Sequence, residues 1–175
     1  MATDVDAEFS ALVQRQSRFV FKVAYAVLLN SYDAEDAVQE TFLKLYRNPG
    51  WKDAANERAY LARVAWRAAV DHKRRSATSR AAAADPLTLD AVASSQLGPH
   101  EIISTANQQA TVHSLINSLP EELRVPLVLS AFEELNSREI AEILGIPEGT
   151  VRTRLQKARQ ILREKMTSAK ETRYA

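Results

Sequence analysis

The sequence contains no cysteine among its 175 residues. Disulfide bonds, thiolate catalysis and cysteine-based zinc sites are therefore excluded. Glycine is also scarce, with four in the chain, and none of them belongs to a glycine-rich phosphate-binding loop. The three histidines, His72, His100 and His113, are too scattered to give the ligand spacing of a metal site. We therefore predict that the chain is not an enzyme and binds no cofactor or metal ion.

Long hydrophobic runs are missing as well. The longest apolar stretch, residues 23–29, is far shorter than the roughly 20 residues that span a bilayer, and the acidic start of the chain does not resemble a signal peptide. Hydrophobic residues nevertheless make up 46% of the chain and charged residues 26%, which is typical of a soluble globular protein. We expect a cytoplasmic protein with no membrane insertion.

An overall excess of charge is absent, since the formal net charge is +1, but the charges are unevenly distributed. Residues 81–123 contain five acidic residues and no lysine or arginine, whereas residues 149–175 contain eight basic residues and two acidic ones. A second basic cluster lies at residues 73–80. Two separate basic patches on a neutral chain suggest two contacts with a polyanion, and two solvated helix ends are the alternative.

The sparse glycines and the lack of alternating apolar and polar residues predict an all-α protein with two small helical modules joined by a flexible linker. The N-terminal module is expected to cover residues 1–76, the linker residues 77–99, and the C-terminal module residues 100–175. The linker is predicted from its alanine, serine and proline content and its few large apolar side chains.

Capping residues and helix breakers predict where the helices begin and end. In the N-terminal module, Asp33 is the expected N-cap of the second helix, and helices are expected over residues 6–29, 33–48 and 56–75. In the C-terminal module, helices are expected over residues 100–118, 120–133, 136–145 and 147–166. Pro120 suits the first position of its helix, whereas Pro126 predicts a kink or a split.

The most specific segment covers residues 136–162 and predicts a helix-turn-helix. Asn136 and Glu139 form a capping-box pair, and Gly145 permits the turn. The buried stripes are expected to contain Ile140, Ala141 and Leu144 in the first helix, and Val151, Leu155, Ala158 and Leu162 in the second. The second helix would then present to a DNA major groove the side chains Arg152, Thr153, Gln156, Lys157 and Gln160.

The helix expected over residues 33–48 has one buried stripe, formed by Val38, Thr41, Phe42 and Leu45. Its opposite face carries Asp36, Gln39, Glu40 and Leu43. An exposed leucine framed by carboxylates predicts a protein-docking surface. Asp36 and Glu40 also leave open a pair of catalytic or metal-binding carboxylates.

The helix expected over residues 56–75 combines aromatic and basic side chains outside its core stripe. The stripe itself contains Leu61, Val64, Ala65 and Ala68. The remaining surface carries Arg63, Trp66, Arg67, Val70, Lys73 and Arg74. Such a surface suits unstacked single-stranded bases and their backbone, although Trp66 suits a buried position equally well.

Taken together, these segments resemble the extracytoplasmic-function group of bacterial sigma factors. Residues 33–47 look like that family's polymerase-binding segment, residues 60–75 are similar to its promoter-melting helix, and residues 119–159 look like the module that reads the upstream promoter element. The resemblance implies that Asp36, Gln39, Glu40 and Leu43 face the clamp helices in the largest subunit of core RNA polymerase.

The resemblance also assigns the two basic surfaces to promoter DNA. It implies that the minus-10 element is captured by Asn56, Arg63, Trp66, Arg67, Lys73 and Arg74. It implies that the minus-35 element is read by Arg152, Thr153, Gln156, Lys157 and Arg159. The chain departs from the family where Trp66-Arg67 replaces a frequent Arg-Asn pair, and Asn136 replaces a Ser or Thr cap. The free protein is expected to be a monomer, with an anti-sigma factor as a candidate partner.

Two other function classes fit parts of the sequence. A stand-alone helix-turn-helix regulator would bind an operator as a dimer, but it leaves the faces with Leu43 and Trp66 without a role. A helical enzyme using Asp36 and Glu40 would bind a metal ion or hold a substrate pocket. A stable dimer in solution would favour the first alternative, and a metal titration would test the second.

Overall fold

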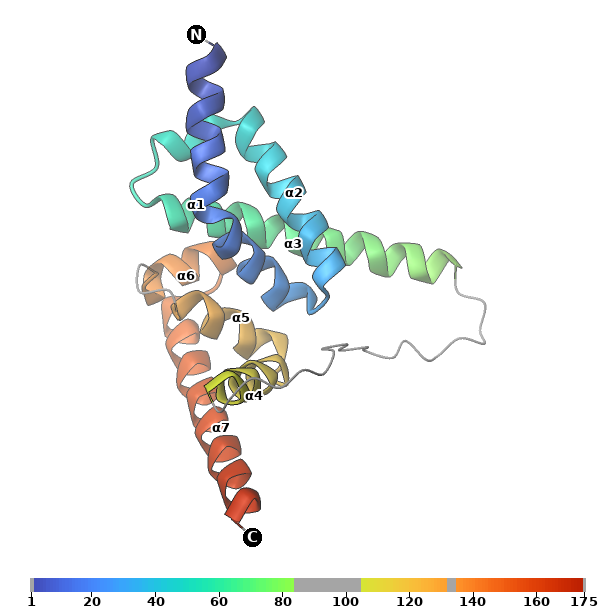
Figure 1. Ribbon diagram of the computed structural model, residues 1–175, viewed down its shortest axis with the longest axis vertical. Coiled ribbons are helices and arrows are strands. Elements are labelled where there is room, and N and C mark those ends of the chain that lie inside the picture. Colours follow the sequence, from blue (N-terminus) through green and yellow to red (C-terminus); the bar gives the residue numbers. More distant parts are fainter. Residues whose placement is uncertain (1, 84–104, 132–134, 175) are drawn as a thin grey trace.

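The computed structural model describes residues 2–83, 105–131 and 135–174, and these residues are almost entirely helical (Figure 1). The N-terminal module contains α1 (Ala2–Leu28), α2 (Ser31–Arg47), the short 3-10 helix η1 (Pro49–Lys52) and α3 (Glu57–Ala83). The C-terminal module contains α4 (Thr105–Asn117), α5 (Glu121–Ser130), α6 (Ser137–Leu144) and α7 (Glu148–Tyr174). The predicted all-α fold with two modules is confirmed.

Three helix boundaries in the N-terminal module differ from the sequence predictions, and the first is the start of α1 at Ala2 instead of residue 6. The N-cap of α2 is Asn30, whose side chain accepts a hydrogen bond from the backbone N–H of Asp33 at 3.0 Å. Asp33 therefore lies in the first turn instead, where its negative charge is favourable. The helix α3 continues to Ala83, past the expected end at Arg75, because its alanine-rich end is a good helix former. The linker residues 84–99 lie outside the described residues.

In the C-terminal module the predicted split of a helix at Pro126 is wrong. The helix α5 runs through Pro126, and Pro120 precedes it as the N-cap instead of occupying its first position. Proline has a backbone angle that suits a helix and costs one hydrogen bond, here to the carbonyl of Glu122 near the helix start. Expected helical residues 100–104 and 132–133 lie outside the described residues, and α7 extends past Met166 to Tyr174.

Each module has its own buried contacts. In the N-terminal module α1, α2 and α3 pack against one another, and Leu12, Val20 and Leu61 are fully buried among them. In the C-terminal module α5 and α6 pack on α7, with Leu129 and Ile140 fully buried. The apolar stripes predicted for α2, α3, α6 and α7 are buried or half-buried in the structure.

The two modules also pack against each other, an arrangement that the sequence did not predict. The helix α1 contacts α5, and α3 contacts α6, while the two ends of the chain point in opposite directions (Figure 1). Buried residues from both modules belong to one continuous hydrophobic cluster. We refer to the surface between α1/α3 and α5/α6 as the module interface.

Candidate nucleic-acid and protein interfaces

The predicted helix-turn-helix is present in α6 and α7. The side chain of Asn136 accepts a hydrogen bond from the backbone N–H of Glu139, and the Glu139 carboxylate accepts one from the N–H of Asn136, so the capping box is complete. Gly145 ends α6 with a φ of 66°, which a side chain with Cβ adopts only under strain. Val151 and Leu155 lie on the buried face of α7. The opposite face of this helix is exposed to solvent.

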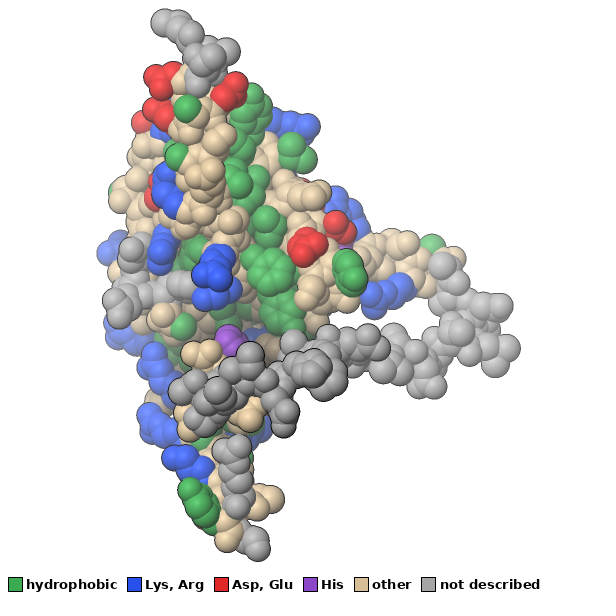
Figure 2. All heavy atoms as spheres, in the orientation of Figure 1, with side chains coloured by type: hydrophobic (Ala, Val, Ile, Leu, Met, Phe, Trp, Pro, Cys, Tyr) green, Lys and Arg blue, Asp and Glu red, His purple; other side chains and the backbone are tan. Residues whose placement is uncertain are grey.

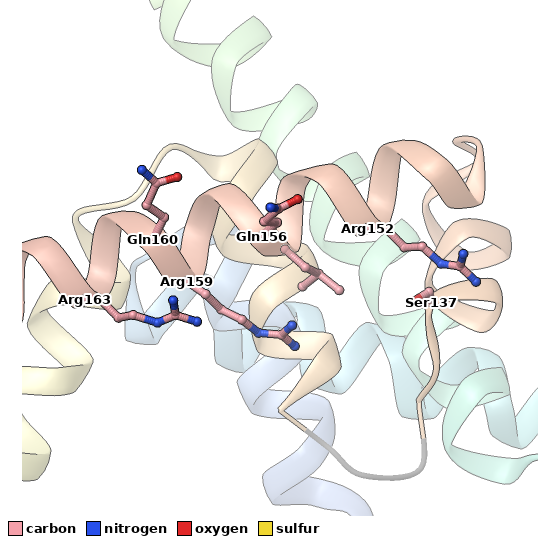
Figure 3. A pocket seen from close by; sticks show the side chains of 7 residues that line it. Ser137, Arg152, Gln156, Arg159, Gln160 and Arg163 are labelled. Carbon is pink, nitrogen blue, oxygen red and sulfur yellow. The ribbon is translucent and has the colours of Figure 1, made fainter.

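The exposed face of α7 borders a shallow hollow of about 420 Å³. Figure 3 shows Arg152, Arg159 and Arg163 along one side of α7, with Gln156 and Gln160 projecting beside them and Ser137 from α6 facing Arg152. The arginines recur at helical spacing, so their charges form one stripe. A basic stripe interrupted by amide side chains can contact phosphates and base edges together.

The hollow differs in two ways from the predicted set. Arg163 and Ser137 line it and were missed, although the i, i+4, i+7, i+11 spacing from Arg152 would have identified Arg163. Thr153 and Lys157 are exposed but lie on the neighbouring stripe of α7, outside the hollow. Arg152 forms an exposed ion pair with Glu148 at 2.6 Å. Such a pair contributes little to stability and is easily exchanged for another anion.

The predicted docking face of α2 is largely exposed. Asp36 and Gln39 are exposed, and the side chain of Leu43 is 55% exposed. Tyr46, one turn further along α2, is 53% exposed and extends the apolar part of this face. Sequence reasoning missed Tyr46, although its i+3 spacing from Leu43 places it on the same face of α2.

Glu40 differs from the other residues of that face. Its carboxylate accepts hydrogen bonds from Arg75 of α3 at 2.7 Å and pairs with Lys44 at 3.1 Å. Burial raises the pKa of Glu40, but the hydrogen bonds from Arg75 and Lys44 outweigh this effect, so the pKa lies below its ordinary value. Glu40 therefore remains ionised and connects α2 to α3.

Asp36 and Glu40 were considered from the sequence as a pair of catalytic or metal-binding carboxylates, and the structure gives them different neighbours. Ligand atoms of Asp33, Asp36 and His72 lie within 4.8 Å of one another, so tertiary structure brings a histidine to the acidic helix. His72 Nε2 lies 3.2 Å from the Asp33 carboxylate, and this polar contact between α2 and α3 accounts for the short distances in the cluster. Glu40 is separately engaged by Arg75. We interpret the cluster as a structural connection between helices.

The predicted nucleic-acid face of α3 is partly covered. Arg67, Lys73 and Arg74 are exposed, whereas Arg63 and Trp66 are half-buried. Trp66 packs against the hydrophobic cluster, so one part of its ring is in the core and the rest is accessible. The buried Nε of Arg63 has no hydrogen-bond partner among the described residues. The exposed stripe on α3 is thus Arg67 and Arg74, with Arg63 at its partly covered end.

Two residues of the predicted set contact the C-terminal module. Asn56 accepts a hydrogen bond at Oδ1 from the backbone N–H of Ala59, which fixes the start of α3, and its Nδ2 donates to Glu139 Oε1 at 3.0 Å. Lys73 forms an ion pair with Glu121 of α5. These side chains are therefore engaged in the module interface.

A large apolar groove of about 930 Å³ lies where the two modules meet. Its apolar walls come from α1, α2, α4, α5 and α7, and include Phe21, Tyr25, Val38, Ile116, Leu127 and Leu162. Figure 2 shows hydrophobic side chains along the seam between α1 and α2. The arrangement offers an apolar binding surface that needs both modules.

None of the described helices is long and apolar enough to cross a membrane.

Comparisons with protein families match both modules. Residues 12–78 match the family described as Sigma-70 region 2, and residues 109–162 match the family described as Sigma-70, region 4. The first match contains α2 and most of α3, and the second contains the helix-turn-helix. The two candidate surfaces thus fall within two regions of one protein class.

Curated relatives are similar to most of the chain. The ECF RNA polymerase sigma factor SigE of Mycolicibacterium smegmatis is 33% identical over 87% of this chain, and the match spans 59% of that relative. SigW of Bacillus subtilis is 29% identical over 93% of this chain and 90% of its own length. The RNA polymerase sigma-H factor of Pseudomonas aeruginosa is 30% identical over 88% of this chain and 83% of its own.

Two solved structures share the fold. The sigma factor RpoE of Bartonella quintana, in complex with the anti-sigma factor NepR, matches with a TM-score of 0.69 and 20% identity over 91% of this chain and 97% of its own. CnrH, in complex with the cytosolic domain of CnrY, matches with a TM-score of 0.60 and 22% identity over 93% of this chain and 90% of its own.

Proposed function

The chain belongs to the extracytoplasmic-function group of RNA polymerase sigma factors, and we propose that it divides promoter recognition between α3, for the minus-10 element, and α7, for the minus-35 element. A sigma factor binds core RNA polymerase and directs initiation at specific promoters, and it is not an enzyme. The observation that supports the division is the pair of basic stripes, one on each module. The module boundaries are those expected from the sequence, except that residues 77–83 of the expected linker belong to α3.

The minus-35 element is read by the side chains that line the hollow beside α7. Arg152 and Gln156 lie near the start of the helix and contact base edges, because the N-terminal part of a recognition helix enters the major groove. Arg159 and Arg163 continue the same stripe and contact phosphates. Thr153 and Lys157, on the neighbouring stripe, contact the backbone at the edge of the groove.

The minus-10 element is captured by α3 and the residue before it. Arg67 and Arg74 attract the backbone, the accessible part of the Trp66 ring stacks on an unpaired base, and Asn56 and Lys73 contribute once the modules separate. Arg63 supplies a further cation whose Nε has no partner among the described residues. Strand opening is driven by the free energy of binding unstacked bases.

Core polymerase docks on the α2 face. Leu43 and Tyr46 supply apolar surface, and Asp36, Gln39 and Glu40 supply polar groups around it, a composition typical of a protein interface. The partner surface is the clamp helices of the polymerase's largest subunit. A cytoplasmic location and a monomeric free state fit this role, because the chain needs polymerase and promoter DNA and no second copy of itself.

An anti-sigma factor is the occupant of the apolar groove between the modules. One structural neighbour, RpoE of Bartonella quintana, is a complex with an anti-sigma factor. The groove of this chain is apolar and about 930 Å³ in volume. An amphipathic segment would bury apolar side chains there. Phe21→Glu places a charge in the groove. This variant should abolish capture of an anti-sigma factor from the same organism, while the docking face of α2 with Asp36 and Leu43 stays unchanged.

Run-off transcription tests the proposed function directly. Sigma-free bacterial core polymerase is given promoter DNA from the chain's own genome, with and without the protein. We expect discrete new transcripts that are lost in the Asp36→Ala/Leu43→Ala double variant and kept in Met166→Ala, a substitution at an exposed apolar residue of α7. DNA binding without core binding or start-site selection would instead favour the dimeric regulator.

A further inference from the structure

One carboxylate, that of Glu40, connects the proposed docking helix α2 to the proposed DNA-binding helix α3. Its Oε2 accepts a hydrogen bond from Nη2 of Arg75 on α3 at 2.7 Å, and its Oε1 lies 3.1 Å from Nζ of Lys44 on α2. The side chain of Glu40 is 27% exposed and that of Arg75 is 63% exposed. Both members of the pair between the helices are therefore accessible to other molecules.

Arg75 extends the exposed basic surface of α3. It directly follows Lys73 and Arg74, and all three are exposed. The helix α3 passes α2 and continues beyond it (Figure 1). A rotation of about 100° per residue places Arg75 beside the stripe of Arg67 and Arg74, on the flank that faces α2. Arg75 would therefore lie within reach of a DNA backbone bound along that stripe.

The pair is weak enough to exchange partners. An ion pair between exposed side chains changes an equilibrium constant by a factor of roughly 1.4 to 5. Glu40 keeps Lys44 as a partner when Arg75 leaves, and a guanidinium binds phosphates as well as carboxylates. Glu40 is the one ion-pair partner of Arg75 within the described parts of the chain. Arg75 therefore exchanges one anion for another at little cost.

We propose that Arg75 is a contact to the DNA backbone, that Glu40 holds it away from DNA in the free chain, and that docking on core polymerase releases it. The step is an exchange of ion pairs: a basic side chain of polymerase binds Glu40, and Arg75 then binds a phosphate beside Arg74. Linkage makes the exchange reciprocal, so removal of Arg75 leaves Glu40 more available to polymerase. This exchange depends on the proposed function, which assigns α2 to polymerase and α3 to the minus-10 element.

Salt-dependent DNA binding by the free chain tests the role of Glu40. A fluorescent single-stranded minus-10 oligonucleotide is titrated at several salt concentrations, because each phosphate contact steepens the slope of log affinity against log salt concentration by about 0.7. Arg75→Gln should leave the slope unchanged, since Glu40 already holds the arginine. Glu40→Gln should steepen the slope by about 0.7. The Glu40→Gln/Arg75→Gln double variant should return it to that of the parent chain.

Glu35→Gln is the matched control for the loss of one negative charge on α2. Glu35 is exposed and has no ion-pair partner among the residues that the structure describes, so this variant should keep the parent slope. Equal steepening by Glu35→Gln would show a general effect of charge and overturn the proposal. An increase that persists in the double variant would overturn it as well, because Arg75 would not be its source.

Core binding without DNA tests the reciprocal effect. Arg75→Gln should bind core polymerase roughly twofold to fivefold more tightly in a fluorescence anisotropy titration, because Glu40 no longer has to exchange its partner. Arg80→Gln removes another exposed arginine of α3 and should leave the Kd unchanged. An unchanged Kd for Arg75→Gln, or equal tightening by both variants, would overturn the exchange.

The holoenzyme should depend on Arg75 where the free chain does not. Once polymerase holds Glu40, Arg75→Gln should make the salt slope of promoter binding shallower by about 0.7–0.9. Filter binding of promoter fragments at several salt concentrations measures this slope. A slope equal to that of the parent holoenzyme would contradict the DNA contact.

Two further variants separate a failure of the exchange from a failure of the proposed function. Arg67→Gln should weaken DNA binding, and Glu40→Gln should weaken core binding, whether or not Arg75 exchanges partners. Loss of both effects would refute the assignment of α2 and α3. Both effects without any dependence on Arg75 would refute the exchange alone.

Discussion

Replacing Leu43 with alanine tests the docking face of α2 at an exposed apolar side chain. Complete burial of a leucine side chain is worth about 1.5–3 kcal/mol, so covering the 55% that is exposed in the free chain is worth roughly 0.8–1.7 kcal/mol. Alanine retains Cβ, and the net loss should be about 1 kcal/mol, or roughly a fivefold higher Kd for core polymerase.

Fluorescence anisotropy of the labelled chain, titrated with core polymerase, measures this change. The folded state should be unaffected, because substitutions at exposed positions alter the free energy of unfolding by no more than about 0.5 kcal/mol. Thermal unfolding of the variant checks that expectation.

Met166→Ala is the matched control, since Met166 is 41% exposed but lies on α7 in the other module. It should leave the Kd unchanged. Equal affinity of both variants and the parent chain would refute the assignment of the α2 face. Equal weakening by both variants would show a general effect of apolar surface and refute it as well.

Three further predictions concern DNA reading, pH and stability. Arg152→Ala should weaken DNA binding by about 1–3 kcal/mol through one upstream base pair. Lys157→Ala should weaken binding to all DNA sequences evenly and lower the slope of log affinity against log salt concentration by about one. Binding to single-base-pair promoter variants measures both effects. The Arg15 hydrogen bond holds the pKa of Glu57 below its ordinary value of 4.5, so this carboxylate stabilises the fold above that pH and loses its effect as the pH falls through the folded-state pKa. Glu57→Gln should thus lower the Tm at neutral pH and not in acid, and an equal loss in acid would contradict this reasoning. Leu155→Ala, at a position 5% exposed, should cost about 2–5 kcal/mol in chemical denaturation, and a cost near zero would contradict its place in the core.

The helix-turn-helix shows how far local chemistry can predict a site. Asn136, Glu139 and Gly145 act through backbone groups within a few residues, so their types and spacing were sufficient to predict the capping box and the turn. The exposed stripe of α7 followed from helical periodicity in the same way. Arg163 could have been included by extending that periodicity by one turn.

Predictions weakened where neighbouring residues competed for one role. Both Asn30 and Asp33 are good N-caps, and the structure uses Asn30. Local preference also overestimated the effect of Pro126, whose backbone angle is compatible with a helix and whose missing N–H costs one bond. Trp66 was undecided between core and surface, and the structure leaves it half-buried.

Sequence reasoning was sufficient to predict the main part of each helix, the capping box and turn of the helix-turn-helix, and the apolar stripes, because these properties depend on groups within one or two turns. Tertiary structure alone decided what each stripe packs against. It brought His72 to Asp33, Asn56 to Glu139, and Arg124 to Ala26 across 98 positions of sequence. An apolar pattern shows that a face is buried, but many partners would bury it equally well. Only the packed fold, in which buried polar groups must also find partners, selects among them.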